Sequence, residues 1–154
     1  MKRIKITLFF LLAVLLSACA SSGSPEAQSG GSSEASTLMV TAGGTSKSYT
    51  RADLEALGST EAVFNDVAYK GVTVSVLVQD AGSDPAQVKA IKAVAADGYS
   101  VNYDSAQIFA DDIIVAYARV DGDLTEDDGA FRMVLPGAEG KLNVRMLSEI
   151  QIIQ

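Results

Sequence analysis

The 154-residue chain offers few side chains for chemistry, because it contains a single cysteine, Cys19, and no histidine. Histidine is the commonest general base and metal ligand in proteins. A Ser-His-Asp triad, a Cys-His pair, a zinc cluster built on His and Cys, and a His-ligated haem are therefore excluded. Any chemistry must come from carboxylates, Lys, Arg, Tyr, Ser, backbone groups or a bound cofactor.

Three basic residues near the C-terminus are the candidates for binding an anion. Arg132 falls on the polar side of an otherwise apolar strand pattern, and Lys141 and Arg145 lie close to Gly137 and Gly140. A guanidinium group forms paired hydrogen bonds with phosphate or carboxylate, and glycine lets a ligand approach the backbone closely. The alternatives are an Arg132 paired with one of the many carboxylates, and a surface loop without a ligand around Lys141 and Arg145.

Two further groups of side chains invite a functional interpretation. Five carboxylates lie between Asp121 and Asp128, and hard cations such as calcium bind oxygen ligands of this type. The spacing does not fit the helix-loop-helix calcium loop, so the pattern favours a hairpin with solvated charges. Four tyrosines could stack on a flat ring, although such residues more often lie at the edge of a core. They are Tyr69, Tyr99, Tyr103 and Tyr117.

Cys19 closes an apolar run that follows a basic start. The residues from Ile6 to Leu16 are almost all apolar, and Leu16-Ser17-Ala18-Cys19 matches the lipobox of bacterial lipoproteins. The pattern predicts a signal peptide over residues 1–18, cleavage before Cys19 and a lipid anchor on its sulfur. A transmembrane helix needs about 20 apolar residues, more than this run supplies. We therefore expect an extracytoplasmic protein that the lipid holds to a membrane of the cell envelope.

Cleavage would leave a strongly acidic protein with room for one domain. The signal removes three of the 12 basic residues and none of the 19 acidic ones, so the net charge falls from −7 to about −10. Such a protein repels phosphate backbones, and nucleic acid is not an expected partner. Residues 19–37 are rich in Ser, Gly and Ala and predict a flexible linker after the lipidated cysteine. The folded domain is expected over residues 38–154.

Alternating apolar residues and turn dipeptides predict an α+β domain that is mostly antiparallel β with a few short helices. A helix is expected after Thr50, which can cap it together with Asp53. Residues 72–82 fit either a strand of alternating valines or a short helix, and residues 86–96 are equally open. Hairpin turns are expected at Asp97-Gly98 and Asp121-Gly122. Strands are expected at residues 38–42, 46–49, 113–118, 131–135 and 149–154.

Five short patterns occur in an order and spacing that resemble one known family. They are Tyr69-Lys70-Gly71-Val72; Ala96-Asp97-Gly98-Tyr99; Ala116-Tyr117 with Asp121-Gly122 and Leu124; Arg132 to Gly137; and Val144-Arg145-Met146-Leu147 with Glu149-Ile150. Together they resemble the sulfite-oxidase-type molybdopterin-binding domain over residues 38–154. The resemblance implies that family's fold, with a short helix at 74–80 and a strand at 88–96.

The resemblance also implies a departure from the family's chemistry. Catalytic members are oxidoreductases that carry a cysteine upstream of the segment matched by Tyr69, and its thiolate binds molybdenum. Here residues 59–66 stand in that place without a cysteine, and Met146 replaces a common tryptophan. Soft metals of this kind favour thiolate ligands. The resemblance therefore implies the scaffold without the protein's metal ligand.

These observations predict a lipoprotein whose domain is a non-catalytic or accessory binding module. Its cofactor would be molybdopterin or a related pterin, bound by Arg132, Lys141 and Arg145. Its other partners would be the membrane, a small anionic ligand or an envelope redox protein. One alternative is a molybdopterin-dependent oxidoreductase that holds its cofactor without a cysteine, and another is a purely structural envelope protein.

Overall fold

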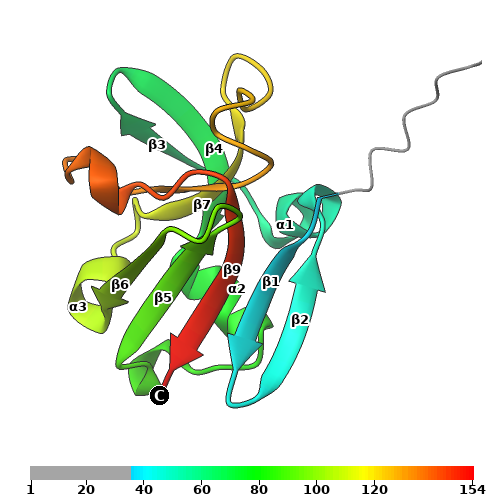
Figure 1. Ribbon diagram of the computed structural model, residues 1–154, viewed down its shortest axis with the longest axis vertical. Helices are drawn as coiled ribbons and strands as arrows, with labels where there is room; N and C mark the ends of the chain where they lie inside the picture. Colours follow the sequence, from blue (N-terminus) through cyan, green and yellow to red (C-terminus); the bar gives the residue numbers. More distant parts are fainter. Residues whose placement is uncertain (1–35) are drawn as a thin grey trace, which may run out of the picture. The chain divides into compact units, whose positions relative to one another are not determined.

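Residues 36–154, which the computed structural model describes, form two β-sheets with short helices between their strands (Figure 1). The predicted signal peptide, Cys19 and nearly all of the predicted linker lie outside the described residues. No helix within residues 36–154 combines the length and the hydropathy that a membrane span requires. The elements are β1 (Leu38–Ala42), β2 (Thr45–Tyr49), α1 (Arg51–Leu57), β3 (Thr60–Phe64), β4 (Val67–Thr73), α2 (Val74–Asp80), η1 (Pro85–Gln87), β5 (Ala90–Ala95), β6 (Ser100–Asp104), α3 (Ser105–Ile108), β7 (Ile114–Arg119), β8 (Arg132–Val134), η2 (Gly140–Leu142) and β9 (Leu147–Ile153).

The first sheet has five strands in the order β2-β1-β9-β5-β6 (Figure 1). The last strand of the chain lies at its centre, where β9 pairs in parallel with β1 and antiparallel with β5. Every other pair in the two sheets is antiparallel, so the predicted α+β class with mostly antiparallel strands is confirmed. Leu147, Ile150 and Ile152 on β9 are buried, which explains the alternating pattern at the end of the sequence.

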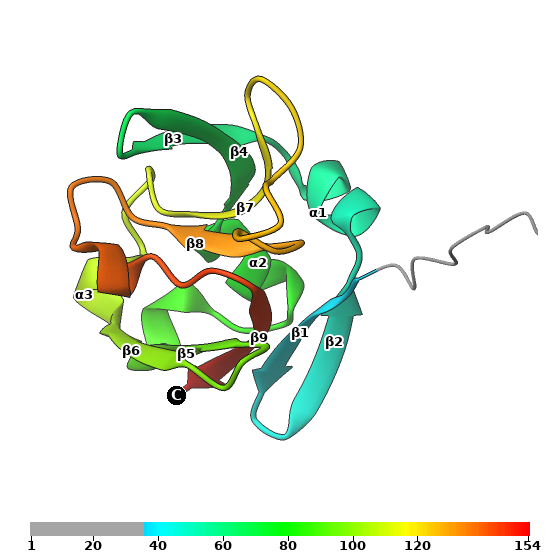
Figure 2. The ribbon, with the colours of Figure 1, turned by 45° about the horizontal axis from the view of Figure 1, so that its top comes forward.

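The second sheet has four strands in the order β3-β4-β7-β8 and curls over the first, as Figure 2 shows. Strand β7 is buried on both faces, as its continuous apolar run predicts. Val115 faces the main core between the two sheets, whereas Ile114 and Ala116 face a second, smaller cluster inside the curl. The polar residues described below lie at the edge of this second cluster.

Capping at Thr73 and strand pairing of residues 90–95 decide the two segments that the sequence pattern leaves open. Thr50 and Asp53 form the predicted reciprocal capping box at the start of α1. Residues 74–80 are helical, with the Thr73 hydroxyl accepting a hydrogen bond from the amide of Val76. Residues 90–95 form a strand. The elements implied by the family resemblance are confirmed at both places.

Gly71 shows why a glycine stands in the middle of β4. The register between β4 and β7 shifts next to it, and a Cβ atom at this position would lie 2.7 Å from the Cα atom of Ala116 and even closer to the carbonyl oxygen of Val115. Only glycine lets the two backbones approach this closely. The glycine therefore sets how tightly β4 packs on β7.

The connection between β7 and β8 differs from the expected hairpin at Asp121-Gly122. Gly122 forms an isolated bridge with Arg119, but the chain then continues through a loop before β8 begins at Arg132. We call residues 120–131 the β7–β8 loop. It carries the acidic cluster of the sequence, and one of its carboxylates is buried.

Candidate functional site

Asp128 is the buried anchor of the β7–β8 loop. Its carboxylate accepts hydrogen bonds from Arg132 Nη1 at 2.6 Å, Arg119 Nη2 at 3.0 Å and the Thr125 hydroxyl at 2.7 Å. The side chains of Asp128 and Arg132 are 4% and 5% exposed, so the ion pair between them is shielded from water. The expectation of a fully solvated acidic cluster is therefore wrong for Asp128, because two arginines neutralise it inside the fold.

These contacts shift the pKa values of Asp128 and Arg119. Burial alone would raise the pKa of Asp128, but hydrogen bonds from Thr125 and Arg119 and the charge of Arg132 outweigh it and lower the pKa. The hydrogen bond to Asp128 raises the pKa of Arg119. Asp128 is therefore ionised at neutral pH and holds the loop to strands β7 and β8.

Arg132 lies on the face opposite to Phe131 and Met133, as predicted, but that face is also buried. Its guanidinium lies over the Tyr69 ring, 4.6 Å from the centroid, and Nη1 also donates to the Tyr69 hydroxyl at 2.8 Å. Nε contacts the backbone of Met133. Within residues 36–154, Nη2 has no protein hydrogen-bond partner, so one donor stays available on a fixed side chain.

Two neighbouring cavities bring together the three basic residues that the sequence singles out. Arg132 and Arg145 line a cavity of about 350 Å³, which we call the arginine cavity. Lys141 and Arg145 line a second cavity of about 730 Å³, which we call the mixed-charge cavity. Gly140, Asn143 and Arg145 belong to both walls. Their volumes lie in the range of small-molecule sites.

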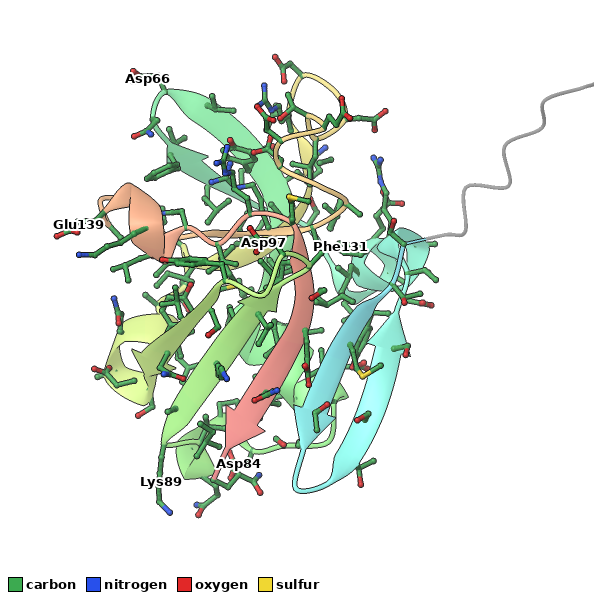
Figure 3. All side chains as sticks on the ribbon, viewed as in Figure 1. Asp66, Asp84, Lys89, Asp97, Phe131 and Glu139 are labelled. Atoms are coloured by element: carbon green, nitrogen blue, oxygen red, sulfur yellow. The ribbon has the colours of Figure 1, made fainter. Side chains whose placement is uncertain are left out.

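The three basic residues differ in whether their positive charge is already paired within the protein. Lys141 forms an exposed ion pair with Glu139 at 2.7 Å, which lowers the pKa of Glu139 and raises that of Lys141. Figure 3 shows Glu139 at the outer end of the η2 segment. Arg145 is exposed and takes part in none of the ion pairs among residues 36–154. Arg145 is thus the most available positive charge on the two cavities.

Asn143 fixes the segment that carries Lys141 and Arg145, and the sequence pattern does not reveal this role. Its buried side-chain oxygen accepts a hydrogen bond from the amide of Leu135 at 2.7 Å, and its amide group donates to the carbonyl of Glu139. These bonds tie η2 to the end of β8. A lone asparagine in a glycine-containing loop carries no sequence signal for such a contact, because its partner depends on the tertiary fold.

Residues 59–66, which stand in place of the family's cysteine-bearing segment, form strand β3 and the tip of the β3–β4 hairpin, and their end lines the arginine cavity. Asn65 and Asp66 both have positive φ, 50° and 62°, which is typical of a tight type I′ turn. Phe64 and Asn65 line the cavity, and Figure 3 shows Asp66 at the hairpin tip. Neither residue is a soft donor. No group of three or more His, Cys, Asp or Glu residues within 36–154 is placed to hold a metal.

The donor set therefore fits the organic part of a molybdopterin-type cofactor better than its metal. Arg145 and the free donor of Arg132 can bind a phosphate. No thiolate lies in the domain, since Cys19 precedes it in the sequence.

The four tyrosines do not share one ligand face. Tyr69 lines the arginine cavity, Tyr99 lines the mixed-charge cavity and Tyr117 lines a separate cavity of about 510 Å³. Tyr103 is buried and donates to the backbone of Leu142 at 2.6 Å. Only Tyr69 and Tyr99 can contact a ligand near the basic residues.

Comparisons with known proteins agree with this architecture. The family model described as oxidoreductase molybdopterin binding domain matches residues 30–154. Among solved structures, the chain is similar to the sulfane dehydrogenase SoxCD from Paracoccus pantotrophus, with a TM-score of 0.65 and 22% identity, which shows the fold alone. The match covers 77% of this chain and 38% of that chain, so this chain spans well under half of its relative. No curated protein matches it by sequence.

Proposed function

The chain belongs to the oxidoreductase molybdopterin-binding domain family, and from this premise we propose that it is an accessory binding module. In this proposal Cys19 anchors it by lipid to the outside of a cell-envelope membrane. Its domain binds a pterin-like or other small anionic ligand and does not catalyse a molybdenum reaction. One observation carries the proposal: two arginines, Arg132 and Arg145, line one cavity with a hairpin tip that offers no thiolate.

The two arginines supply different contributions to anion binding. Arg132 is held by Asp128 and Tyr69, so its free Nη2 donor is already oriented before a ligand arrives. Little conformational entropy is lost when such a fixed donor binds. Arg145 is exposed and supplies the charge that Asp128 has cancelled on Arg132. Lys141 adds a third cation after release from its exposed pair with Glu139, which costs little.

The proposed role of the domain is binding rather than redox catalysis. A bound molybdopterin supplies oxidation–reduction chemistry at its metal. The residues of this chain can hold the phosphate-bearing part of the cofactor, orient it between Arg132 and Arg145 and pack it against Tyr69. An envelope redox protein remains a partner in this proposal, since an accessory module would present its ligand to such a protein.

Titration of the full-length protein in non-ionic detergent with 6-hydroxymethylpterin phosphate tests the site, with pterin fluorescence as the readout. Arg145→Ala should weaken binding about fivefold or more, because it removes an uncompensated cation from the cavity. Its free energy of unfolding should hardly change, because the side chain is exposed. Lys89→Ala is the matched control, since Lys89 lies at the far end of the domain (Figure 3).

Three outcomes would contradict the proposal. If Arg145→Ala bound the pterin phosphate as tightly as the wild-type protein, the proposed anion site would be wrong. Stoichiometric molybdenum in protein made in a cofactor-competent host would favour the oxidoreductase alternative. An unmodified Cys19, shown by the intact mass of the protein purified from membranes, would exclude the lipid anchor.

A further inference from the structure

The mixed-charge cavity combines acidic and basic walls that do not neutralise each other. Asp97, Glu126 and Asp127 line it together with Lys141 and Arg145. Among residues 36–154, no ion pair joins either cation to any of these three carboxylates. Charges of both signs that do not pair with each other around one cavity complement a ligand that carries both signs itself.

The backbone holds the three wall segments at fixed separations. The amide of Met146 donates to the carbonyl of Asp128 at 2.7 Å, and the carbonyl of Met146 accepts from the amide of Ala96 at 2.8 Å. Met146 has a φ of 50°, and Gly129 packs so closely that a Cβ atom there would lie 2.7 Å from the Met146 Cα atom. These bonds join the β7–β8 loop, the β5–β6 hairpin and the segment before β9.

The buried Asp128 network also fixes the position of the neighbouring carboxylates. Thr125 and Asp128 close a turn by a hydrogen bond from the Asp128 amide to the Thr125 carbonyl at 2.9 Å. Glu126 and Asp127 lie inside this turn, are exposed, and have no side-chain hydrogen bond within residues 36–154. The buried ion pair thus places two free carboxylates on the wall of the cavity.

The residues that line the two cavities supply groups for the two ends of a ligand. Arg145 also borders the arginine cavity, where the buried Arg132 offers its free Nη2 donor. Figure 3 shows Asp97 at the β5–β6 turn, beside the segment that leads into β9. Tyr99 lines the same cavity and adds an aromatic ring, a group that attracts cations.

We propose that the joined cavities bind a small zwitterion of the phosphoethanolamine type, with its phosphate at Arg145 and Arg132 and its ammonium group at Asp97, Glu126 and Asp127. The inference rests on the proposed anion site and names the class of its ligand. Free metabolites and lipid headgroups both carry this chemistry.

Calorimetry on the full-length protein in non-ionic detergent separates the contributions of the two charges. The probes are phosphoethanolamine, ethyl phosphate and ethylamine, which share the two-carbon unit and differ only in the charged ends. Phosphoethanolamine should bind about tenfold tighter than ethyl phosphate, since each exposed charge pair contributes up to about fivefold. Ethylamine should bind weakest. If glycerophosphoethanolamine binds as tightly as phosphoethanolamine, the natural ligand is a lipid headgroup. If it binds more weakly, the natural ligand is a free phosphate monoester.

The double variant Glu126→Gln/Asp127→Asn provides the decisive comparison. It should reduce the preference for phosphoethanolamine to about threefold or less, because Asp97 alone remains near the ammonium group, and it should leave ethyl phosphate binding unchanged or slightly tighter. Asp111→Asn/Asp112→Asn removes the same charge from a turn that lines neither cavity and should keep the preference. Urea unfolding should show that both variants remain folded.

Two results would overturn the inference, and they separate it from the proposed function. Equal affinities for phosphoethanolamine and ethyl phosphate in the wild-type protein would reject the zwitterion and leave the anion site intact. Absence of binding by every phosphate-containing probe would reject both.

Discussion

Replacement of Asp128 by asparagine should destabilise the domain strongly, because Asp128 is the only carboxylate among residues 36–154 that pairs with Arg119 and Arg132. The variant keeps the size of the side chain and removes its charge. It leaves the buried guanidinium of Arg132 without its negatively charged partner at 2.6 Å and weakens the 3.0 Å contact with Arg119.

The magnitude follows from the burial of the pair. Removal of one partner from a buried, hydrogen-bonded ion pair costs about 3–5 kcal/mol, since the other charge stays desolvated and unpaired. Asparagine retains one acceptor oxygen for Thr125 or Arg132, so we expect a loss near the lower limit, about 3 kcal/mol. For a domain of this size, such a loss lowers the melting temperature by about 10 °C.

Urea unfolding followed by circular dichroism measures this loss, and Asp123→Asn is the matched control. Asp123 also pairs with an arginine, Arg51, but its side chain is 81% exposed, so its removal should cost no more than about 1 kcal/mol. The urea dependence should stay unchanged in both variants, with a shift in the midpoint alone. If Asp128→Asn cost no more than Asp123→Asn, the buried network would not be what holds the β7–β8 loop, and the reasoning would be refuted.

Two further predictions concern stability. Acidification below about pH 4 should reduce the stability of the wild-type protein more than that of Asp128→Asn. The pKa of Asp128 is lower in the folded than in the unfolded protein, so its contribution to stability is complete above the unfolded pKa and is lost as the pH falls through the folded pKa. Urea midpoints measured between pH 2 and 7 check this, and parallel curves for the two proteins would contradict it. Gly71→Ala should lower the free energy of unfolding by about 3 kcal/mol or prevent folding, since the added methyl group would clash with the backbone of Val115 and Ala116. Thermal unfolding measures the effect. A melting temperature within 2 °C of wild type would show that β4 and β7 can move apart without loss of stability.

Much of the fold could be predicted from the sequence because its signals are local. The Thr50–Asp53 capping box and the turn at Asp97-Gly98 depend on residues at most three positions apart, and both are present as predicted. Residues 72–82 could not be decided in this way, since a valine-rich segment fits both periodicities. The structure decides it: β4 ends at Thr73, and residues 74–80 form the helix α2, which buries Val74, Leu77 and Val78 in the main core.

The candidate site was predictable in its residue types and not in its connections. Guanidinium chemistry makes Arg132 and Arg145 candidate anion ligands, and both line one cavity. Composition could not show that Arg132 is buried against Asp128. Nor could it show that Asn143 holds the segment of Lys141 to the end of β8 by a hydrogen bond from the amide of Leu135. Those contacts need strands and loops that meet only after folding.

The sequence by itself determined the inventory: no histidine, no cysteine within the domain, an excess of carboxylates and the order of strands and short helices. These properties limit the chemistry whatever the fold, because a missing donor cannot be supplied by geometry. The tertiary structure decided which charges cancel and which remain free. Burial removes water from Asp128 and forces it to pair with Arg119 and Arg132, whereas Arg145 stays at the surface, where its charge is open to a ligand.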